Sequence, residues 1–262
     1  MEIRDQFQLK TIYTAGRTRL REILFSAADS GVYQQTTYIS ADFFNNLKSG
    51  GVPSQAGLTS VKECLLQIPE IDSQIRESET GAVIFKGDQS ALVILPPFPI
   101  SEVSIHTDGH ILPVMSLLEA QLVVGVIFLR LGRYAVGVFG GDVLLASKTG
   151  TRHVKNRHRQ GGSSQRRFER SRERLVREFY DKACAVAGDV ISPFRDSIDY
   201  LMFGGERHTL NGFGKRCRLV RELEKKTLNR RIPVGRPGQK ALESATKEMW
   251  VGKVLVFSKS CA

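Results

Sequence analysis

Three apolar runs in the middle of the chain predict the core of a β-sheet. LVVGVIFL at 122–129 and RYAVGVF at 133–139 are rich in β-branched and aromatic residues, which favour buried strands. The Gly-Gly-Asp sequence at 140–142 supplies a hairpin turn into the third run, VLLA at 143–146. The longest run lies between Gln121 and Arg130 and is far too short to span a bilayer.

Further strands and helices alternate on both sides of this core. GAVIFKG at 81–87 and ALVIL at 91–95 read as paired strands, and LPVMSLLEAQL at 112–122 reads as a helix. DYLMFGG at 199–205 and KVLVFS at 253–258 read as two more strands. This alternation predicts an α/β or α+β protein.

Two helices are expected in the second half of the chain. After Arg166 the apolar residues recur with a helical period, and Gly188 is placed to end that helix. GKRCRLVRELEKK at 214–226 has the pattern of a basic amphipathic helix. The stripe of the first helix contains Phe168, Leu175, Val176, Phe179, Ala183 and Val186.

The length of 262 residues fits two domains of ordinary size. A boundary after the proline-rich segment near residue 100 predicts an N-terminal mixed α/β domain over 1–108 and a second domain over 109–262. The first ten residues mix both charge signs and lack an apolar segment, which argues against a secretory signal. We therefore expect a cytoplasmic protein with no membrane partner.

The cysteines and histidines offer no recognisable metal site. Cys64, Cys184, Cys217 and Cys261 lie far apart with no CxxC pair, and the five histidines form no HExxH motif. We expect reduced thiols, no structural metal and no cofactor.

The positive charge of the chain is concentrated. The formal net charge is +11, and residues 152–177 hold ten Lys or Arg against two Glu. A second basic stretch, residues 207–231, holds nine Lys or Arg. A solvated face usually mixes the two signs, whereas clustered positive charge is typical of proteins that bind a polyanion such as nucleic acid.

RQGGSSQRRF at 159–168 lies inside the first basic stretch, between the predicted sheet and the predicted helix. Gly161 and Gly162 permit a close approach of backbone to another molecule, and Ser163 or Ser164 can cap the helix. Arginines in the first helical turn are unfavourable unless an anion lies opposite them. The segment therefore predicts a loop held between phosphates that presents the amide of Gln165.

The chemistry open to this loop is limited. A glutamine amide does not titrate near neutral pH, but it can orient a water molecule and, with backbone N–H groups, stabilise an oxyanion. The spacing of a phosphate-binding P-loop, GxxxxGK[ST], is absent here and around GFGK at 212–215. The sequence therefore favours hydrolysis by positioning of water.

The apolar strand pair, the basic approach, the glycine pair with glutamine and the basic helix resemble the central domain of the eukaryotic and archaeal class-1 translation release factors. The loop GGSSQRRF at 161–168 is more similar to the Vms/ANKZF branch and its bacterial release-factor-like relatives, which are peptidyl-tRNA hydrolases. The resemblance covers roughly residues 82–262. It implies a mixed sheet flanked by helices, with a glycine-rich catalytic loop at 161–165 projecting from it.

The resemblance also implies roles for individual residues. The catalytic residues would be Gln165 with Gly161, Gly162, Ser163 and Ser164, which together position water for ester hydrolysis between the nascent peptide and tRNA. In the termination factors glutamine follows the two glycines directly, so Gln165 and Ser163 both remain candidates for the catalytic position. The RNA-binding residues would be Arg152, Lys155, Arg157, Arg159, Arg166, Arg167, Arg170 and Arg174.

The implied partners are the large ribosomal subunit, ribosomal RNA and peptidyl-tRNA, and the implied state is a monomer. The implied function is release of nascent peptides from stalled ribosomes. Two alternatives stay open: a non-catalytic surveillance factor that binds ribosomes or RNA, and an RNA nuclease. In the nuclease reading, His153 and His158 would be general bases, but no carboxylate cluster accompanies them.

Overall fold

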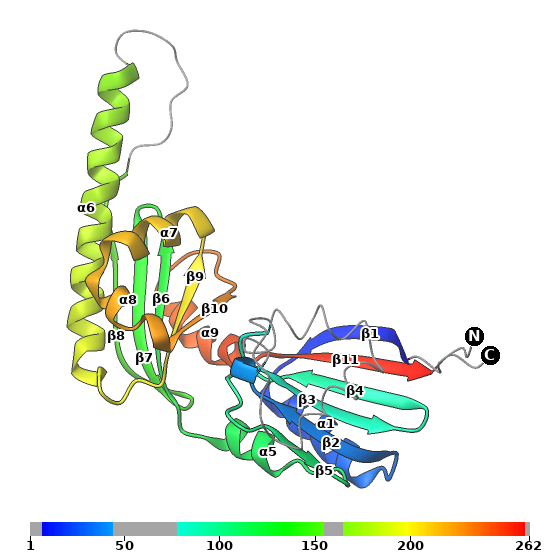
Figure 1. The fold of residues 1–262 in the computed structure, drawn as a ribbon. Helices are drawn as coiled ribbons and strands as arrows, with labels where there is room; N and C mark the ends of the chain where they lie inside the picture. The colour runs from blue at the N-terminus through cyan, green and yellow to red at the C-terminus, as the bar shows by residue number, and fades with distance from the viewer. Residues whose placement is uncertain (1–6, 44–77, 155–164, 260–262) are drawn as a thin grey trace. The chain divides into compact units, whose positions relative to one another are not determined.

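The computed structural model describes residues 7–43, 78–154 and 165–259. The chain forms two compact units, residues 1–120 with 249–262, and residues 121–248. Each unit contains one β-sheet with helices packed against it (Figure 1). The fold is a mixed α/β architecture, as the sequence predicts.

The first unit is built on a six-stranded antiparallel sheet. The paired strands predicted at 81–87 and 91–95 are confirmed, with Val83 opposite Ile94 and Lys86 opposite Ala91. The strand order is β1 (Phe7–Ala15), β11 (Gly252–Lys259), β4 (Ser90–Leu95), β3 (Ala82–Gly87), β2 (Tyr33–Ile39) and β5 (Ser104–His106). Helices α1 (Arg17–Asp29) and α5 (Leu112–Glu119) lie in the described part of this unit.

This division of the chain differs from the boundary expected between residues 108 and 109. Helix α5 belongs to the first unit because it lies beside α1: Arg17 Nε donates to the Leu118 carbonyl at 2.5 Å, and Arg21 pairs with Glu119 at 3.0 Å. The final strand, β11, also belongs to the first unit, since it pairs with β1 and β4. Strand pairing depends on backbone hydrogen bonds between strands that meet in space, so the position of a strand in the sequence does not decide which unit it joins.

The second unit contains a mixed five-stranded sheet. The β6–β7–β8 meander is antiparallel, and β9 and β10 add to it in parallel. The strand order is β10 (Thr227–Ile232), β9 (Tyr200–Gly205), β6 (Val123–Arg130), β7 (Arg133–Gly140) and β8 (Val143–Thr151). The helices are α6 (Gln165–Ile191), α7 (Arg207–Arg216), α8 (Arg218–Glu222) and α9 (Gln239–Met249), with two short 3-10 turns, Ser192–Phe194 and Glu224–Lys226.

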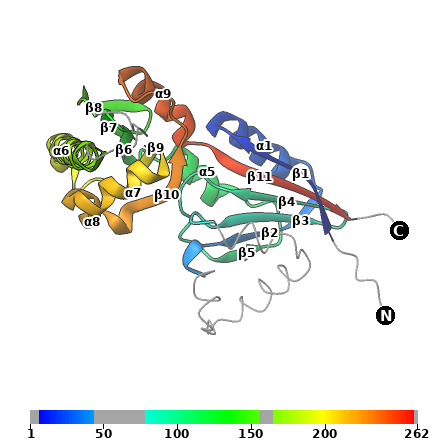
Figure 2. The same cartoon turned by 90° about the horizontal axis from the view of Figure 1, so that it is seen from above.

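Helices cover both faces of this sheet. Seen from above, α6, α7 and α8 lie on one face and α9 lies on the other (Figure 2). On the first face, Ile127, Val136 and Val138 of the sheet pack with Phe179 and Ala183 of α6 in one buried cluster. The predicted mixed sheet flanked by helices is confirmed.

Helix α6 is longer than the sequence pattern indicates. The prediction that Gly188 ends the helix is wrong, because the helix continues to Ile191. Val190 and Ile191 are buried, so apolar packing beyond the glycine offsets its low helix propensity. The apolar stripe also begins later than expected: Phe179, Ala183 and Val186 are buried, but Phe168 is 55% exposed.

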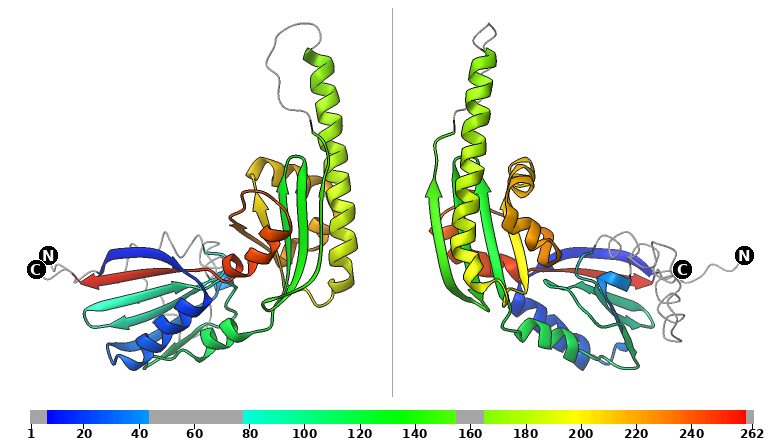
Figure 3. Two further views of the ribbon diagram at one scale, coloured as in Figure 1. Left: turned by 180° about the vertical axis from the view of Figure 1, so that it is seen from behind. Right: turned by 60° about the vertical axis from the view of Figure 1, so that its left-hand side comes forward.

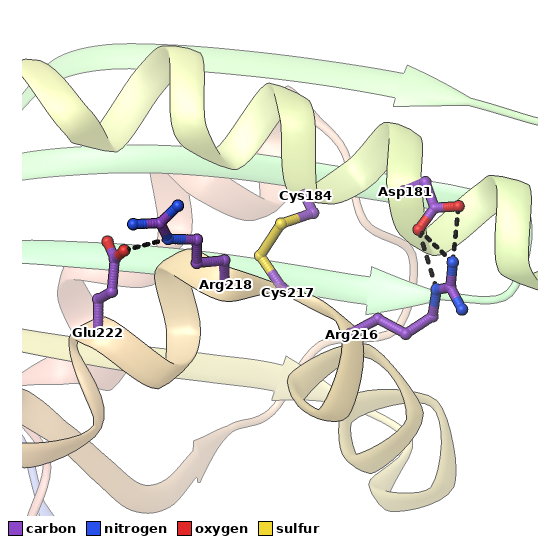
Figure 4. The surroundings of a disulfide bond; sticks show 6 residues. All are labelled: Asp181, Cys184, Arg216, Cys217, Arg218 and Glu222. Carbon is purple, nitrogen blue, oxygen red and sulfur yellow. Dashed lines mark hydrogen bonds and ion pairs between the residues drawn. A yellow bond between two sulfur atoms is a disulfide. The ribbon is translucent and has the colours of Figure 1, made fainter.

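The helix predicted over 214–226 is broken. Cys217 has extended backbone angles, φ −81° and ψ 112°, and separates α7 from α8. Its sulfur forms a disulfide with Cys184 of α6, with a Cα–Cα distance of 5.3 Å (Figure 4). The expectation of reduced thiols is therefore wrong for this pair: the two cysteines lie 33 residues apart in the sequence, and only the packing of α7 against α6 brings them together.

Candidate functional site

Helix α6 has a buried half and an exposed half. From Phe179 to Ile191 one side of the helix packs on β7 and the neighbouring helices. Residues 166–170 are all exposed, and this part of the helix extends beyond the ends of the strands (Figure 3). We call the exposed part of this helix, residues 165–178, the arm. The sheet fixes its base.

The base of the arm is attached to the end of β8 by charge. Arg152, which directly follows β8, donates to Glu178 Oε2 at 2.6 Å. Arg174 approaches the other oxygen of the same carboxylate, with Nε 3.8 Å from Oε1. Glu178 therefore contacts two of the predicted RNA-binding arginines. Through Arg152, Glu178 also holds the chain at the point where the chain leaves the sheet.

The tip of the arm lies far from this ion pair. Gln165 is the first residue of α6 and precedes Glu178 by thirteen positions, so it lies about 20 Å further along the helix axis at 1.5 Å per residue. At this distance from the sheet, the amide of Gln165 can enter a narrow site. The globular part of the unit is too large to enter such a site.

The side chain of Gln165 is held by one hydrogen bond. Its Nε2 donates to Glu169 Oε1 at 3.0 Å, across one turn of the helix. A glutamine amide that donates through nitrogen keeps its carbonyl oxygen as an acceptor. Gln165 can therefore accept a hydrogen bond from a water molecule while Glu169 fixes the orientation of the amide.

Arginines follow Gln165 along the helix. Arg166, Arg170 and Arg174 are four residues apart and share one side of the helix, and Arg167 lies next to them. Arg166, Arg167 and Arg170 are exposed. We call Arg166, Arg167, Arg170 and Arg174 the arginine stripe. A stripe of this length matches a phosphate backbone better than a single anion.

Several predicted site residues lie outside the described part of the chain. These are Gly161, Gly162, Ser163 and Ser164 of the loop, and Lys155, Arg157, Arg159 and His158 of the basic approach. The exposed His153 lies just after Arg152. The structure therefore brings Arg152 and Arg174 together at Glu178 and carries Gln165 at the tip, and the catalytic and RNA-binding roles of all these residues stay predictions.

The disulfide and the residues around it also hold α6 against the rest of the second unit. Arg216 donates twice to Asp181 of α6, with both distances 2.9 Å, and this hydrogen bonding raises the pKa of the guanidinium (Figure 4). Tyr180 packs beside Phe213 of α7, with a ring separation of 6.3 Å, and burial raises the pKa of its phenol. These contacts hold α6 against α7 around residues 180–184.

No group of three or more His, Cys, Asp or Glu side chains that could hold a metal occurs among residues 7–43, 78–154 and 165–259. Within the same residues, no helix is both long and apolar enough to cross a membrane. What the described side chains offer is an amide, a positioned carboxylate and a row of guanidinium groups. This set can orient water and bind phosphates.

Comparison with known families identifies the second unit. The family model described as "Actinobacteria/chloroflexi VLRF1 release factor" matches residues 123–255, just over half of the chain. The match begins at β6 and runs through the arm and the disulfide to β11. A release-factor-like protein is thus the class that the family match defines. The chain belongs to the VLRF1 release factor family of Actinobacteria and Chloroflexi.

Curated relatives are similar to this chain over part of their length. A protein of Archaeoglobus fulgidus named peptide chain release factor subunit 1 is 31% identical over 153 residues, which are 57% of this chain and 38% of that protein. The protein of the same name from Methanopyrus kandleri is 25% identical over 248 residues, covering 91% of this chain and 57% of the relative. The chain therefore spans roughly 40 to 60% of the length of these relatives.

Solved structures include similar chains at low identity. The archaeal translation termination factor aRF1 matches with a TM-score of 0.40 and 17% identity, covering 90% of this chain and 73% of that one. The Vms1 mitochondrial localization core matches with a TM-score of 0.42 and 12% identity, covering 70% of this chain and 80% of that one. Both values are too low to carry an argument about individual residues.

Sequence reasoning missed two carboxylates of the site. Glu169 lies four residues after Gln165, so the helical spacing alone could have paired them. Glu178 has the same spacing from Arg174, but its contact with Arg152 joins two elements and has no signal in the sequence.

Proposed function

We propose that the protein is a peptidyl-tRNA hydrolase that releases nascent peptides from tRNA on stalled ribosomes or large ribosomal subunits. The observation that carries the proposal is the amide of Gln165, held by Glu169 at the tip of an arginine-lined arm about 20 Å beyond the Arg152–Glu178 pair. Membership of a release factor family supports the same reaction class.

In the proposed mechanism the arm enters the ribosome and the loop at 161–165 reaches the ester bond that joins peptide to tRNA. The carbonyl oxygen of Gln165 accepts a hydrogen bond from the attacking water, while Glu169 fixes the amide. Backbone N–H groups of Gly161, Gly162, Ser163 and Ser164 stabilise the oxyanion that forms when the water oxygen bonds to the ester carbonyl carbon. The bond from that carbon to the tRNA ribose oxygen then breaks, and the ribose oxygen receives the proton that the water loses. No metal or cofactor takes part in this scheme.

In this proposal the basic side chains bind RNA phosphates. The arginine stripe contacts ribosomal RNA or the tRNA acceptor stem, and Arg152 adds a contact at the base of the arm. Lys155, Arg157 and Arg159 extend this surface along the approach to the loop. The protein acts as a cytoplasmic monomer with the large subunit, ribosomal RNA and peptidyl-tRNA as partners.

Single-turnover release of a labelled peptide tests the proposal. Purified large subunits carrying peptidyl-tRNA are mixed with the wild type, Gln165→Ala, Ser163→Ala or the control Glu173→Ala, and binding to the same subunits is measured separately. Glu173 is an exposed carboxylate of the arm, about two turns of helix beyond Gln165. Loss of release with retained binding in Gln165→Ala assigns the water-positioning role to that residue. Loss only in Ser163→Ala moves the role to the position directly after the glycines.

A second candidate function is a ribosome-binding surveillance factor without hydrolase activity. The exposed arginine stripe favours it, since RNA binding needs no active amide. Under this candidate the wild type binds large subunits but releases no peptide, and substitutions at Gln165 and Ser163 change nothing.

A further inference from the structure

The bond between Cys184 and Cys217 is the only disulfide among the described residues, and it connects two elements that no other covalent link joins directly. Cys184 lies on α6, six residues beyond Glu178, and Cys217 is the single extended residue between α7 and α8. The bond therefore holds the α7–α8 junction against the helix that carries the arm (Figure 4).

Apolar side chains and a bidentate ion pair also cross this junction, and the ion pair is partly exposed. The Arg216–Asp181 pair is 41% and 56% exposed, and exposed ion pairs contribute little to stability. Arg218 pairs with Glu222 within α8, so it does not cross to α6. The disulfide is thus the strongest constraint on the α7–α8 junction outside the apolar core.

The two cysteine residues differ in exposure. Cys217 is fully buried and belongs to the apolar cluster beneath α6, whereas Cys184 is half-buried at the edge of the same cluster. A small thiol or disulfide in solution therefore meets Cys184 first. Cys217 can react only with the partner that already touches it.

Exchange with a small disulfide requires access to the attacking cysteine. The half-buried Cys184 offers this access, whereas the fully buried Cys217 does not. The guanidinium groups next to Cys217 in the chain, those of Arg216 and Arg218, are each paired with a carboxylate.

We propose that Cys184 and Cys217 are a redox-active pair that reversibly staples α6 to the α7–α8 junction by exchange with low-molecular-weight disulfides and thiols. In the oxidising direction the Cys184 thiolate attacks the small disulfide, forms a mixed disulfide and releases one thiol. The Cys217 thiolate then attacks the Cys184 sulfur, forms the protein disulfide and releases the second thiol. Two electrons pass to the small disulfide, which leaves as two thiols.

The Cys184–Cys217 disulfide stabilises the second unit, which carries the arm, against unfolding. Closing a loop of 33 residues restricts the unfolded chain, and for a unit of this size the effect amounts to a shift in Tm on the order of 10 °C. Between the two melting temperatures only the oxidised protein keeps its folded arm. The redox state of the pair thereby sets the temperature range in which the arm can bind RNA.

The test uses the full chain with Cys64→Ser and Cys261→Ser, so that only the proposed pair can react. The protein is equilibrated in mixtures of oxidised and reduced glutathione, and the oxidised fraction is measured by alkylation and mass spectrometry. The expected result is a reversible transition to a linked pair, with Cys184 alkylated before Cys217 in the reduced protein. Two free thiols at every glutathione ratio would overturn the proposal.

Thermal melting measures how much the Cys184–Cys217 disulfide stabilises the protein. The reduced protein and a Cys184→Ser/Cys217→Ser variant should both melt on the order of 10 °C below the oxidised protein, and only the parent should respond to reductant. Equal Tm values for oxidised and reduced protein would refute the staple. Alkylation and melting do not depend on peptide release, so the pair can succeed or fail independently of the proposed hydrolase function.

Discussion

Gln165 donates its amide N–H to Glu169 Oε1 at 3.0 Å, across one turn at the start of α6. Residues 152–177 contain only two acidic residues, and one of them is used for this contact. A carboxylate among arginines weakens phosphate binding, so its position next to Gln165 is better explained by orientation of the amide than by RNA recognition.

Replacement of Glu169 should separate catalysis from binding. One hydrogen bond contributes about 0.5–1.5 kcal/mol, so we expect Glu169→Ala to slow single-turnover peptide release about 2- to 10-fold. Binding to large subunits should stay the same or tighten, because a negative charge is lost. Glu169→Gln should restore much of the rate, and Glu173→Ala is the matched control. A full release rate in Glu169→Ala would remove the positioning role.

The arginine stripe should determine how binding depends on salt. Each arginine that contacts a phosphate displaces condensed counterions, so Arg166→Ala, Arg167→Ala and Arg170→Ala should each reduce the slope of log affinity against log salt by about 1. Affinity for ribosomal RNA or large subunits is measured between about 50 and 200 mM salt. Arg19→Ala, whose arginine pairs with Glu22 on α1 of the first unit, should leave the slope unchanged. A slope that no stripe variant alters would contradict the assignment.

Replacement of two phenylalanines of α6 should affect stability to very different extents. Phe179 is fully buried against the sheet, so Phe179→Ala should lower the free energy of unfolding by about 3–5 kcal/mol. Phe168 is 55% exposed in the arm, and Phe168→Ala should change it by less than about 1 kcal/mol. Urea unfolding of both variants measures the difference. Equal losses would mean that the arm packs as tightly as the base of the helix.

Gly205 should tolerate no side chain. Its φ is +131°, and a Cβ atom there would lie 2.0 Å from the Leu129 carbonyl oxygen of the neighbouring strand. We expect Gly205→Ala to lower the free energy of unfolding by at least about 2 kcal/mol, because the strained backbone and the clash act together.

Gly188 provides the matched control for this substitution. It lies inside α6 with nothing within 4 Å of a Cβ position, so Gly188→Ala should raise the free energy of unfolding by about 0.5–1 kcal/mol. Thermal or urea unfolding tests both variants, and a stable Gly205→Ala protein would contradict the close approach of β9 to β6.

The sequence by itself predicted most of the strands and helix α6, and it suggested a chemistry for the tip that stays a prediction. Apolar β-branched runs predicted β6, β7 and β8, and the helical period predicted α6, because these patterns depend on local spacing. The glutamine in a basic, glycine-containing segment indicated positioning of water and binding of phosphates, since residue type alone limits that chemistry. The Gln165–Glu169 contact also follows a local spacing.

Only the tertiary structure decided which distant residues meet. It placed β11 between β1 and β4, joined Cys184 to Cys217, and brought Arg152 to Glu178. It also extended α6 past Gly188, where burial of Val190 and Ile191 outweighs a local preference to stop. These contacts depend on how strands and helices pack in space, and a linear pattern holds no record of that packing.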